Sequence, residues 1–228
     1  MIKLVFFDLY LTLIDVSGVN PDELDRSAYD ILRNAGYRVE YTGFKDALKT
    51  VYGKWRSFRR SQLIEVNPRV WWQEVLLRLR IPAKIKLLND ILSTRHTVFL
   101  RKIKLYEDVA QILNYLKNRQ ILIGIISNCS DAEFAREELE YLGIDGYIDL
   151  LITSAEYGRR KPSIKLFEDL LESLPVRNDE IIMVGDDYEN DVEPWGRLNV
   201  EAYLLDRGKS NSYKRSISSL LELEKIIG

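Results

Sequence analysis

Short apolar runs alternate with helical segments over the second half of the chain, and this alternation limits the possible folds more than any other feature. Four runs rich in β-branched residues are predicted as buried parallel strands, at residues 121–126, 147–153, 181–184 and 200–205. Helical patterns lie around them, at residues 108–116, 131–142, 164–174 and 189–198. Repeated strand–helix units predict an α/β fold built on a doubly wound parallel sheet.

A helical segment interrupts this pattern after the first strand, which is predicted at residues 3–7. Four helices follow with no strand between them; two begin at the Asn-Pro pairs of residues 20–21 and 67–68, where Asn suits the N-cap and Pro the first turn. We therefore predict a core of residues 1–15 and 102–228, with a four-helix bundle inserted at residues 16–101. Such an insertion is expected to sit above the strand ends as a lid.

Composition excludes several classes of partner. The 228 residues include 33 basic and 35 acidic side chains, and this net charge of −2 gives no reason to expect nucleic acid as a partner. No apolar stretch approaches the length that spans a bilayer, so no membrane partner is expected either. The single Cys129 rules out an intrachain disulfide and suits a reducing compartment, so we expect a cytoplasmic protein. The sequence leaves open whether it is a monomer or a homodimer.

Polar and charged side chains follow the predicted strands at the points where they end. Asp8 ends the first strand, with Thr12 four residues later, and Ser127 and Asn128 end the second. The other groups follow the third and fourth strands: Lys161, Asp186, Asp187 and Asp191. Open α/β sheets carry their chemistry at the carboxyl ends of the strands, so we expect these side chains to share one site. A carboxylate with a nearby hydroxyl suits a nucleophile whose transferred group is steadied by a hydrogen bond.

The order of these motifs, with a helical insertion after the first, resembles the haloacid dehalogenase-like hydrolase superfamily over nearly the whole chain. The resemblance implies that Asp8 attacks a phosphoryl group and forms an aspartyl intermediate, which water hydrolyses. It implies a Mg²⁺ ion held by Asp8, the main-chain carbonyl of Tyr10 and Asp186. The implied substrate is a small phosphorylated molecule, and the helical insertion corresponds to that family's cap.

The resemblance also assigns supporting roles. Ser127 is expected to donate a hydrogen bond to a phosphoryl oxygen, and Lys161 to add a positive charge beside it. Asp187 and Asp191 are expected to orient metal-bound water or Lys161. Asn128, with Ser127, also suits the cap of the helix at residues 131–142, whose N-terminus would favour an anion.

Tyr10 departs from the family's phosphatases, which usually place a second Asp two residues after the nucleophile as general acid and base. A phenol has a pKa of about 10 and is a poor base near neutral pH. Loss of one acid–base group typically costs about 10²–10⁴-fold in rate. We therefore expect a slow phosphatase, a preference for good leaving groups, or different chemistry.

Two alternatives follow from Tyr10. The family's metal-independent L-2-haloacid dehalogenases carry a similar Asp-x-Tyr-x-Thr segment, but they usually have Ser and Asn where this chain has Asp186 and Asp187. They also tend to carry a Tyr at the position of Phe167. The second alternative is a catalytically weak protein that keeps the phosphate and metal site. We favour the metal-dependent phosphatase, because clustered carboxylates need a counter-charge.

The helical insertion is less informative. Its four cations at residues 54, 56, 59 and 60 are predicted to form a solvated face, in preference to a face that meets an anionic substrate. Trp55, Trp71 and Trp72 are predicted to form the core of the insertion, unless one ring lines the substrate pocket. Arg26 and Arg38 are candidates for the arginine that dehalogenases keep in their cap, with no motif to single out either. His96 could replace the missing acid–base group, but a structural or surface role is favoured for it, and Cys129 is expected to be a small buried side chain.

Overall fold

The computed structural model describes residues 1–208 and 213–228 and divides into two compact units. The core unit comprises Met1–Val16 and Lys104–Gly228, and the helical unit comprises Ser17–Ile103. These boundaries lie within two residues of those predicted from the sequence. Two short antiparallel strands, β2 (Ile14–Asp15) and β3 (Lys104–Leu105), pair in the core unit where the chain leaves for the helical unit and returns from it.

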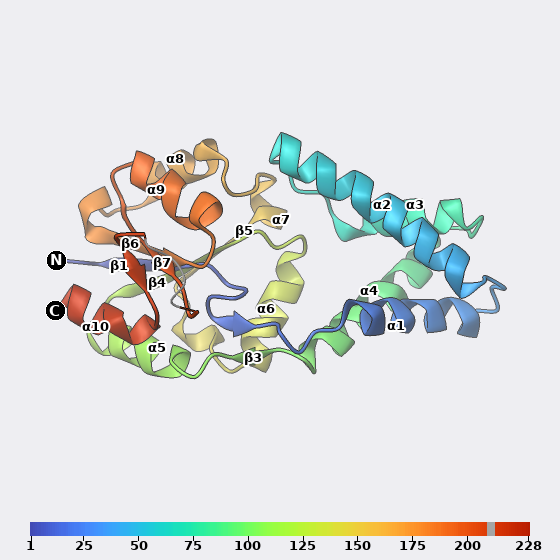
Figure 1. Ribbon diagram of the computed structural model, residues 1–228, viewed down its shortest axis with the longest axis horizontal. Helices are drawn as coiled ribbons and strands as arrows, with labels where there is room; N and C mark the ends of the chain where they lie inside the picture. Colours follow the sequence, from blue (N-terminus) through green and yellow to red (C-terminus); the bar gives the residue numbers. More distant parts are fainter. Residues whose placement is uncertain (209–212) are drawn as a thin grey trace. The chain divides into compact units, whose positions relative to one another are not determined.

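The core unit is built on a six-stranded sheet in the order β5-β4-β1-β6-β7-β8, with every adjacent pair parallel (Figure 1). The strands are β1 (Leu4–Phe7), β4 (Leu122–Ser127), β5 (Leu150–Thr153), β6 (Ile181–Gly185), β7 (Glu201–Leu205) and β8 (Ser216–Ile217). Helices cover both faces, so all four residues of β1 are fully buried, which explains its continuous apolar sequence. The predicted α/β fold with a doubly wound parallel sheet is confirmed.

Helices α8 (Ile164–Ser173) and α9 (Glu193–Arg197) lie on one face of the sheet, and α5 (Val109–Asn118) and α10 (Leu223–Ile227) on the other (Figure 1). On the first face, Phe6 packs on Trp195 with ring centroids 5.4 Å apart, and Phe167 packs on the same indole at 5.0 Å. Two further helices, α6 (Ala132–Tyr141) and α7 (Ser154–Tyr157), follow β4 and β5. Asp131 caps α6 by accepting hydrogen bonds from the backbone N–H groups of Glu133 and Phe134.

Two predicted elements were wrong in part. The strand predicted at residues 147–153 begins only at Leu150, because a 3₁₀ turn at Asp145–Tyr147 precedes it. The helix predicted at residues 189–198 is a π-helical turn at Tyr188–Val192 followed by α9. Pro194 has no N–H for a regular α-helical hydrogen bond, which explains why the helix changes its pitch there.

The helical unit contains α1 (Pro21–Asn34), α2 (Tyr41–Gln62), α3 (Pro68–Arg78) and α4 (Ile85–Leu100). Two asparagines cap helices as predicted: Asn20 accepts from the N–H of Asp22, and Asn67 from that of Arg69, each at 2.9 Å. The helices enclose an aromatic core in which Phe44 stacks on the buried Trp72. His96 is buried and stacks on Phe99, as expected for a structural residue.

The cations of α2 do not form a uniformly solvated face, so that prediction was wrong in part. Arg59 stacks its guanidinium 4.1 Å from the ring centroid of Trp71 and lies 3.5 Å from a carboxylate oxygen of Glu65. Lys54 pairs with Glu74 at 2.7 Å. Two of the four cations are therefore held by neighbours within the helical unit.

Candidate active site

Asp8 lies at the centre of the sheet's carboxyl edge. It follows β1 directly, and β1 pairs with β4 on one side and β6 on the other. Phe7 is in register with Ile125 of β4 and Val184 of β6, and the N–H of Asp8 donates to the carbonyl of Val184 at 2.9 Å. The ends of three adjacent strands therefore bring Asp8, Ser127 and Asp186 to one edge, as the sequence predicted.

Lys161 reaches this edge from the loop that precedes α8. Its Nζ donates to Oδ1 of Asp8 at 2.6 Å, to Oδ1 of Asp191 at 2.5 Å and to the carbonyl of Ile126 at 2.9 Å. The side chain is almost fully buried. Burial opposes its charge, but attraction to Asp191 and Asp8 outweighs this and raises the pKa of Lys161 above its usual value. Lys161 is therefore a buried ammonium that bridges two carboxylates.

Asn128 holds the backbone of Lys161. Its Oδ1 accepts from the N–H of Lys161 at 2.8 Å, and its Nδ2 donates to the carbonyl of the same residue at 3.0 Å. This two-point contact fixes the loop that carries the ammonium. The sequence placed Asn128 in the site as a helix cap near an anion, whereas the structure shows that Asp131 caps α6 and Asn128 positions Lys161.

Three carboxylates meet beside this lysine. Ligand oxygens of Asp8, Asp186 and Asp191 all lie within 4.8 Å of one another, close enough to share one cation. Asp187 points elsewhere, because its Oδ1 accepts from the N–H groups of Glu189 and Asn190 and so caps the π-helical turn. That turn instead brings Asp191 into the cluster.

The carboxylates repel one another in the absence of a cation. Burial and the negative charge of Asp8 raise the pKa of Asp186 to about 6. Burial also raises the pKa of Asp191; Lys161 opposes this shift and Asp8 adds to it. A divalent cation would relieve this repulsion, so the side chains present fit a magnesium site.

Two hydroxyl groups complete the edge. Thr12 is fully buried, and its Oγ1 lies 3.4 Å from Oδ1 of Asp186 in donor geometry. Ser127 is also buried, and its Oγ has no hydrogen-bond partner among the residues that the structure describes. A buried hydroxyl without a protein partner is costly unless a ligand satisfies it, which fits an oxyanion contact at Ser127.

Tyr10 turns its hydroxyl toward helix α6. The hydroxyl donates to Oε2 of Glu138 at 2.7 Å and lies 3.5 Å from Sγ of Cys129. Burial and these two neighbours raise the pKa of Tyr10 well above its usual value. Sequence reasoning missed Glu138, although a charged residue three positions after Ala135 on the apolar stripe of α6 marks it as unusual.

Gly185 leaves the space that this arrangement needs. A Cβ atom at this position would lie only 2.4 Å from Oδ2 of Asp191. The last residue of β6 must therefore lack a side chain for Asp191 to reach Lys161.

Comparison with known proteins identifies the family. The model of the family "Haloacid dehalogenase-like hydrolase" matches residues 38–203, which is most of the chain. The chain belongs to the haloacid dehalogenase-like hydrolases. The predictions of the family and of a hydrolase are thereby confirmed.

Several curated relatives of this hydrolase are named as phosphatases. The glyceraldehyde 3-phosphate phosphatase of Methanocaldococcus jannaschii is 27% identical, covering 100% of this chain and 97% of that protein. The enzyme of that name from Methanothermobacter thermautotrophicus is 26% identical over 90% and 86% of the two chains. A ribulose-1,5-bisphosphate 5-phosphatase from Halopiger xanaduensis is 31% identical over 53% of this chain, and the match spans half of that relative's length.

Solved structures of haloacid dehalogenase-like hydrolases share the fold. A HAD phosphatase from Thermococcus onnurineus superposes with a TM-score of 0.67 at 23% identity, over 100% of this chain and 98% of the other. A 2-haloacid dehalogenase from Pseudomonas syringae pv. tomato DC3000 gives 0.71 at 20% identity over the same shares. The fold is therefore common to enzymes with both kinds of chemistry and does not choose between them.

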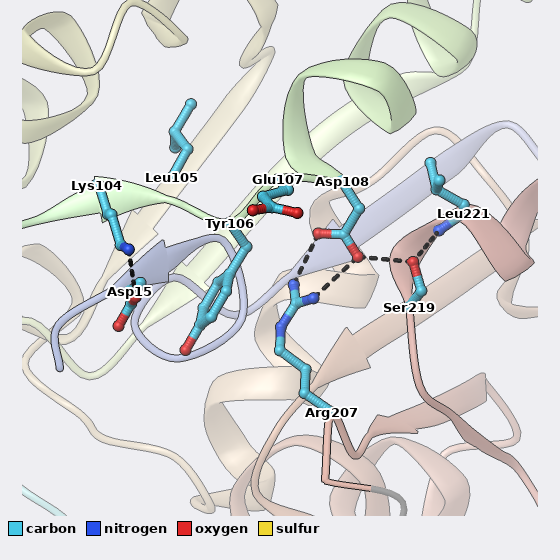
Figure 2. Close-up of a pocket in the computed structure, with 9 residues that line it drawn as sticks. All are labelled: Asp15, Lys104, Leu105, Tyr106, Glu107, Asp108, Arg207, Ser219 and Leu221. Carbon is cyan, nitrogen blue, oxygen red and sulfur yellow. Dashed lines mark hydrogen bonds and ion pairs between the residues drawn. The ribbon is translucent and has the colours of Figure 1, made fainter.

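A cavity of about 470 Å³ lies in the core unit of this hydrolase, beside strands β2 and β3 (Figure 2). Its described lining includes Tyr106 and Arg207 but not Asp8. Figure 2 shows the guanidinium of Arg207 paired with both carboxylate oxygens of Asp108, at 2.9 and 3.0 Å. Arg207 also donates to the main-chain carbonyl of Thr12 at 3.0 Å. Sequence reasoning missed this contact, which ties the loop after Asp8 to the segment after β7.

No helix among residues 1–208 and 213–228 is long and apolar enough to cross a bilayer.

Proposed function

We propose that the protein is a Mg²⁺-dependent phosphatase that acts on a small phosphorylated metabolite through an aspartyl-phosphate on Asp8. The observation that carries this proposal is the position of Asp8, which lies 2.6 Å from the buried Lys161 ammonium and in one cluster with Asp186 and Asp191. The curated relatives, which are named as phosphatases, support it.

Asp8, Asp186 and the main-chain carbonyl of Tyr10 would hold the cation. When bound, Mg²⁺ would neutralise the repulsion between the attacking carboxylate and the phosphoryl oxygens. Asp191 supports this site by holding Lys161. Asp187 contributes to the site indirectly, because its side chain caps the π-helical turn that contains Asp191.

The side chains of this edge suit two displacement steps. In the first, a bond forms between a carboxylate oxygen of Asp8 and phosphorus while the bond to the leaving oxygen breaks. In the second, water attacks phosphorus, which releases phosphate and restores the Asp8 carboxylate. Lys161 and Ser127 would stabilise the phosphoryl oxygens in both steps, Asn128 would keep Lys161 in place, and Thr12 would steady Asp186.

Tyr10 is the specific observation that favours a second candidate, a metal-independent hydrolase of the 2-haloacid dehalogenase kind. In that chemistry Asp8 would displace halide from carbon, and no cation would be required. The carboxylates of Asp186 and Asp191 beside Asp8 oppose this candidate, because their negative charges would weaken Asp8 as a nucleophile unless a further cation offsets them. A catalytically weak phosphate-binding protein is the remaining alternative, since Tyr10 supplies no evident base.

The location and partners follow from charge and cysteine content. A net charge of −2 gives no reason to invoke nucleic acid or a membrane surface, and one buried thiol suits a reducing cytoplasm. We assign the helical unit the role of the family's cap, which selects the substrate.

The test is phosphate release from p-nitrophenyl phosphate, with Mg²⁺ and with EDTA. The native protein and Asp8→Asn are compared, with Asp145→Asn as a matched control because Asp145 is an exposed aspartate of the core unit. Release that requires both Mg²⁺ and Asp8, and that survives in Asp145→Asn, supports the proposal. Halide release from 2-chloropropionate in EDTA would replace it with the dehalogenase.

A further inference from the structure

The hydroxyl of Tyr10 has one proton to donate, and in the structure that proton takes part in a hydrogen bond to Glu138. Tyr10 stands where a phosphatase of this kind needs a proton donor for the leaving group, two residues after the nucleophile. Its hydroxyl donates to Oε2 of Glu138 at 2.7 Å. The nearby thiol of Cys129 does not compete for that acceptor, because Sγ donates to the carbonyl of Asp131 at 3.1 Å.

Glu138 holds this hydroxyl firmly, because its own side chain is buried in the core unit. Only 2% of the residue is exposed, on a face of α6 that also buries Ala135 and Leu139. A hydrogen bond to a buried carboxylate is among the stronger kinds, and breaking it would leave a buried oxygen without this donor. Glu138 therefore acts as a positioning residue that keeps the Tyr10 hydroxyl turned toward α6.

Other ionisable groups beside Asp8 also have partners within the protein. Lys161 donates to Asp8, Asp191 and the carbonyl of Ile126, so all three of its protons are in use. Asp186 belongs to the carboxylate cluster. Tyr10 and Lys161 are therefore not placed to protonate a departing oxygen, and a cation bound in the proposed site would keep Asp186 ionised.

We propose that this enzyme acts on phosphoryl compounds whose leaving group departs as a stable anion: acyl phosphates, enol or aryl phosphates, and phosphoanhydrides. The inference rests on the proposed phosphatase function and narrows its substrate class. In the first step the Asp8–phosphorus bond forms, the bond from phosphorus to the leaving oxygen breaks, and the electron pair leaves on that oxygen. A carboxylate, an enolate or a phosphate carries this charge without a proton from the enzyme, whereas a simple alkoxide does not.

The dependence of rate on the leaving group tests the inference. Values of kcat/KM are measured with Mg²⁺ for a series of aryl phosphates whose phenols have pKa values from about 4 to 10, together with acetyl phosphate and glycerol phosphate. We expect log kcat/KM to fall steeply with leaving-group pKa, acetyl phosphate to be a good substrate, and glycerol phosphate to be turned over at least about 10²-fold more slowly than it.

Three variants show whether the proton of the Tyr10 hydroxyl takes part in the first step. Tyr10→Asp supplies an acid and is expected to flatten the slope and to speed glycerol phosphate hydrolysis by about 10²-fold or more. Tyr10→Phe is expected to keep the native slope, whatever its absolute rate, because no proton came from the hydroxyl. Glu138→Gln retains an oxygen acceptor for Tyr10 and is also expected to keep the slope. Circular dichroism of each variant checks that it folds.

A shallow native slope that becomes steep in Tyr10→Phe would overturn the inference, because Tyr10 would then be the acid. Glycerol phosphate turned over as fast as acetyl phosphate would overturn it too. Both outcomes leave the proposed phosphatase function intact. Absence of release from every compound in the series, acetyl phosphate included, would instead overturn the phosphatase function and the inference with it.

Discussion

The Nζ of Lys161 lies 2.5 Å from Oδ1 of Asp191, and both side chains are almost fully buried. Lys161→Met would leave Asp191 and Asp8 as buried carboxylates without their counter-charge, which typically costs about 3–5 kcal/mol. We expect urea unfolding in EDTA to show a loss of stability of that size. In the double variant Lys161→Met/Asp191→Asn the loss is expected to be smaller than the sum of the two single losses.

Lys165→Met is the matched control, because Lys165 pairs with Asp169 at the surface of α8 and its side chain is half exposed. Exposed ion pairs contribute about 0–1 kcal/mol, so little change is expected. Equal losses in Lys161→Met and Lys165→Met would show that the buried ion pair is not what stabilises this edge.

Asp186 is expected to make Mg²⁺ binding at the proposed site depend on pH. Its pKa of about 6 in the fold lies above the usual value of an aspartate, so in EDTA its ionisation costs stability as pH rises from about 4 to 7. A proton and a cation compete for the same oxygen, so Mg²⁺ affinity is expected to rise over the same range, by up to about tenfold per pH unit below pH 6. Thermal unfolding with graded Mg²⁺ at pH 5, 6 and 7 measures both effects.

Saturating Mg²⁺ is expected to raise stability by about 2.7 kcal/mol at one hundred times its Kd. Asp186→Asn should bind Mg²⁺ more weakly and lose most of the pH dependence. Asp187→Asn serves as the comparison, because that side chain caps the neighbouring turn and is not in the carboxylate cluster. Magnesium stabilisation that is independent of pH in the native protein would contradict the assignment of Asp186.

The core of this site could be predicted because parallel strands align their carboxyl ends. The position of each motif after an apolar run was enough to place Asp8, Ser127 and Asp186 at one edge. The different positions of Asp187, which caps the turn, and Asp191, which joins the carboxylate cluster, could not be predicted. They depend on a π-helical turn that a single proline disturbs. Periodicity does not reveal a one-residue change of pitch.

The residues that contact Tyr10 and Thr12 from other elements of the fold could not be predicted from the sequence either. Glu138 reaches Tyr10 across 128 positions, and Arg207 reaches the carbonyl of Thr12 across 195. Strand β8 has two residues, which is too short to leave an alternating pattern. Contacts between elements far apart in sequence depend on tertiary packing, and no local propensity encodes them.

Gly185 offers a test of how closely Asp191 must approach the end of β6. A methyl group there would meet the Asp191 side chain at 2.4 Å, so Gly185→Ala is expected to displace it and loosen its bond to Lys161. We expect a loss of stability of about 1–3 kcal/mol and a lower kcat in the phosphatase assay. Gly196→Ala is the control, since a Cβ there meets no atom within 4 Å. Equal activity in the two variants would show that Asp191 tolerates displacement.

Asp108 anchors the segment that follows β7. It accepts two hydrogen bonds from Arg207, one from Oγ of Ser219 at 2.8 Å and one from the N–H of Leu220 at 2.9 Å. Burial opposes its ionisation, but these donors outweigh burial and lower the pKa of Asp108. Asp108→Asn keeps the shape and removes the charge, so we expect unfolding at pH 7 to become easier by about 2–4 kcal/mol.

The pH dependence of that loss identifies its cause. A carboxylate with a lowered pKa stabilises the fold above the pKa of the unfolded chain, about 4, and the stabilisation is lost as pH falls through the lower folded value. The difference between native protein and Asp108→Asn in urea unfolding should therefore be constant from pH 7 to 5 and shrink below pH 4. Glu107 is an exposed neighbour that lines, with Asp108, the cavity of Figure 2, so Glu107→Gln should differ little in stability from the native protein at any pH. A loss in Asp108→Asn that persists unchanged at pH 3 would mean that hydrogen-bond geometry, and not charge, makes Asp108 important.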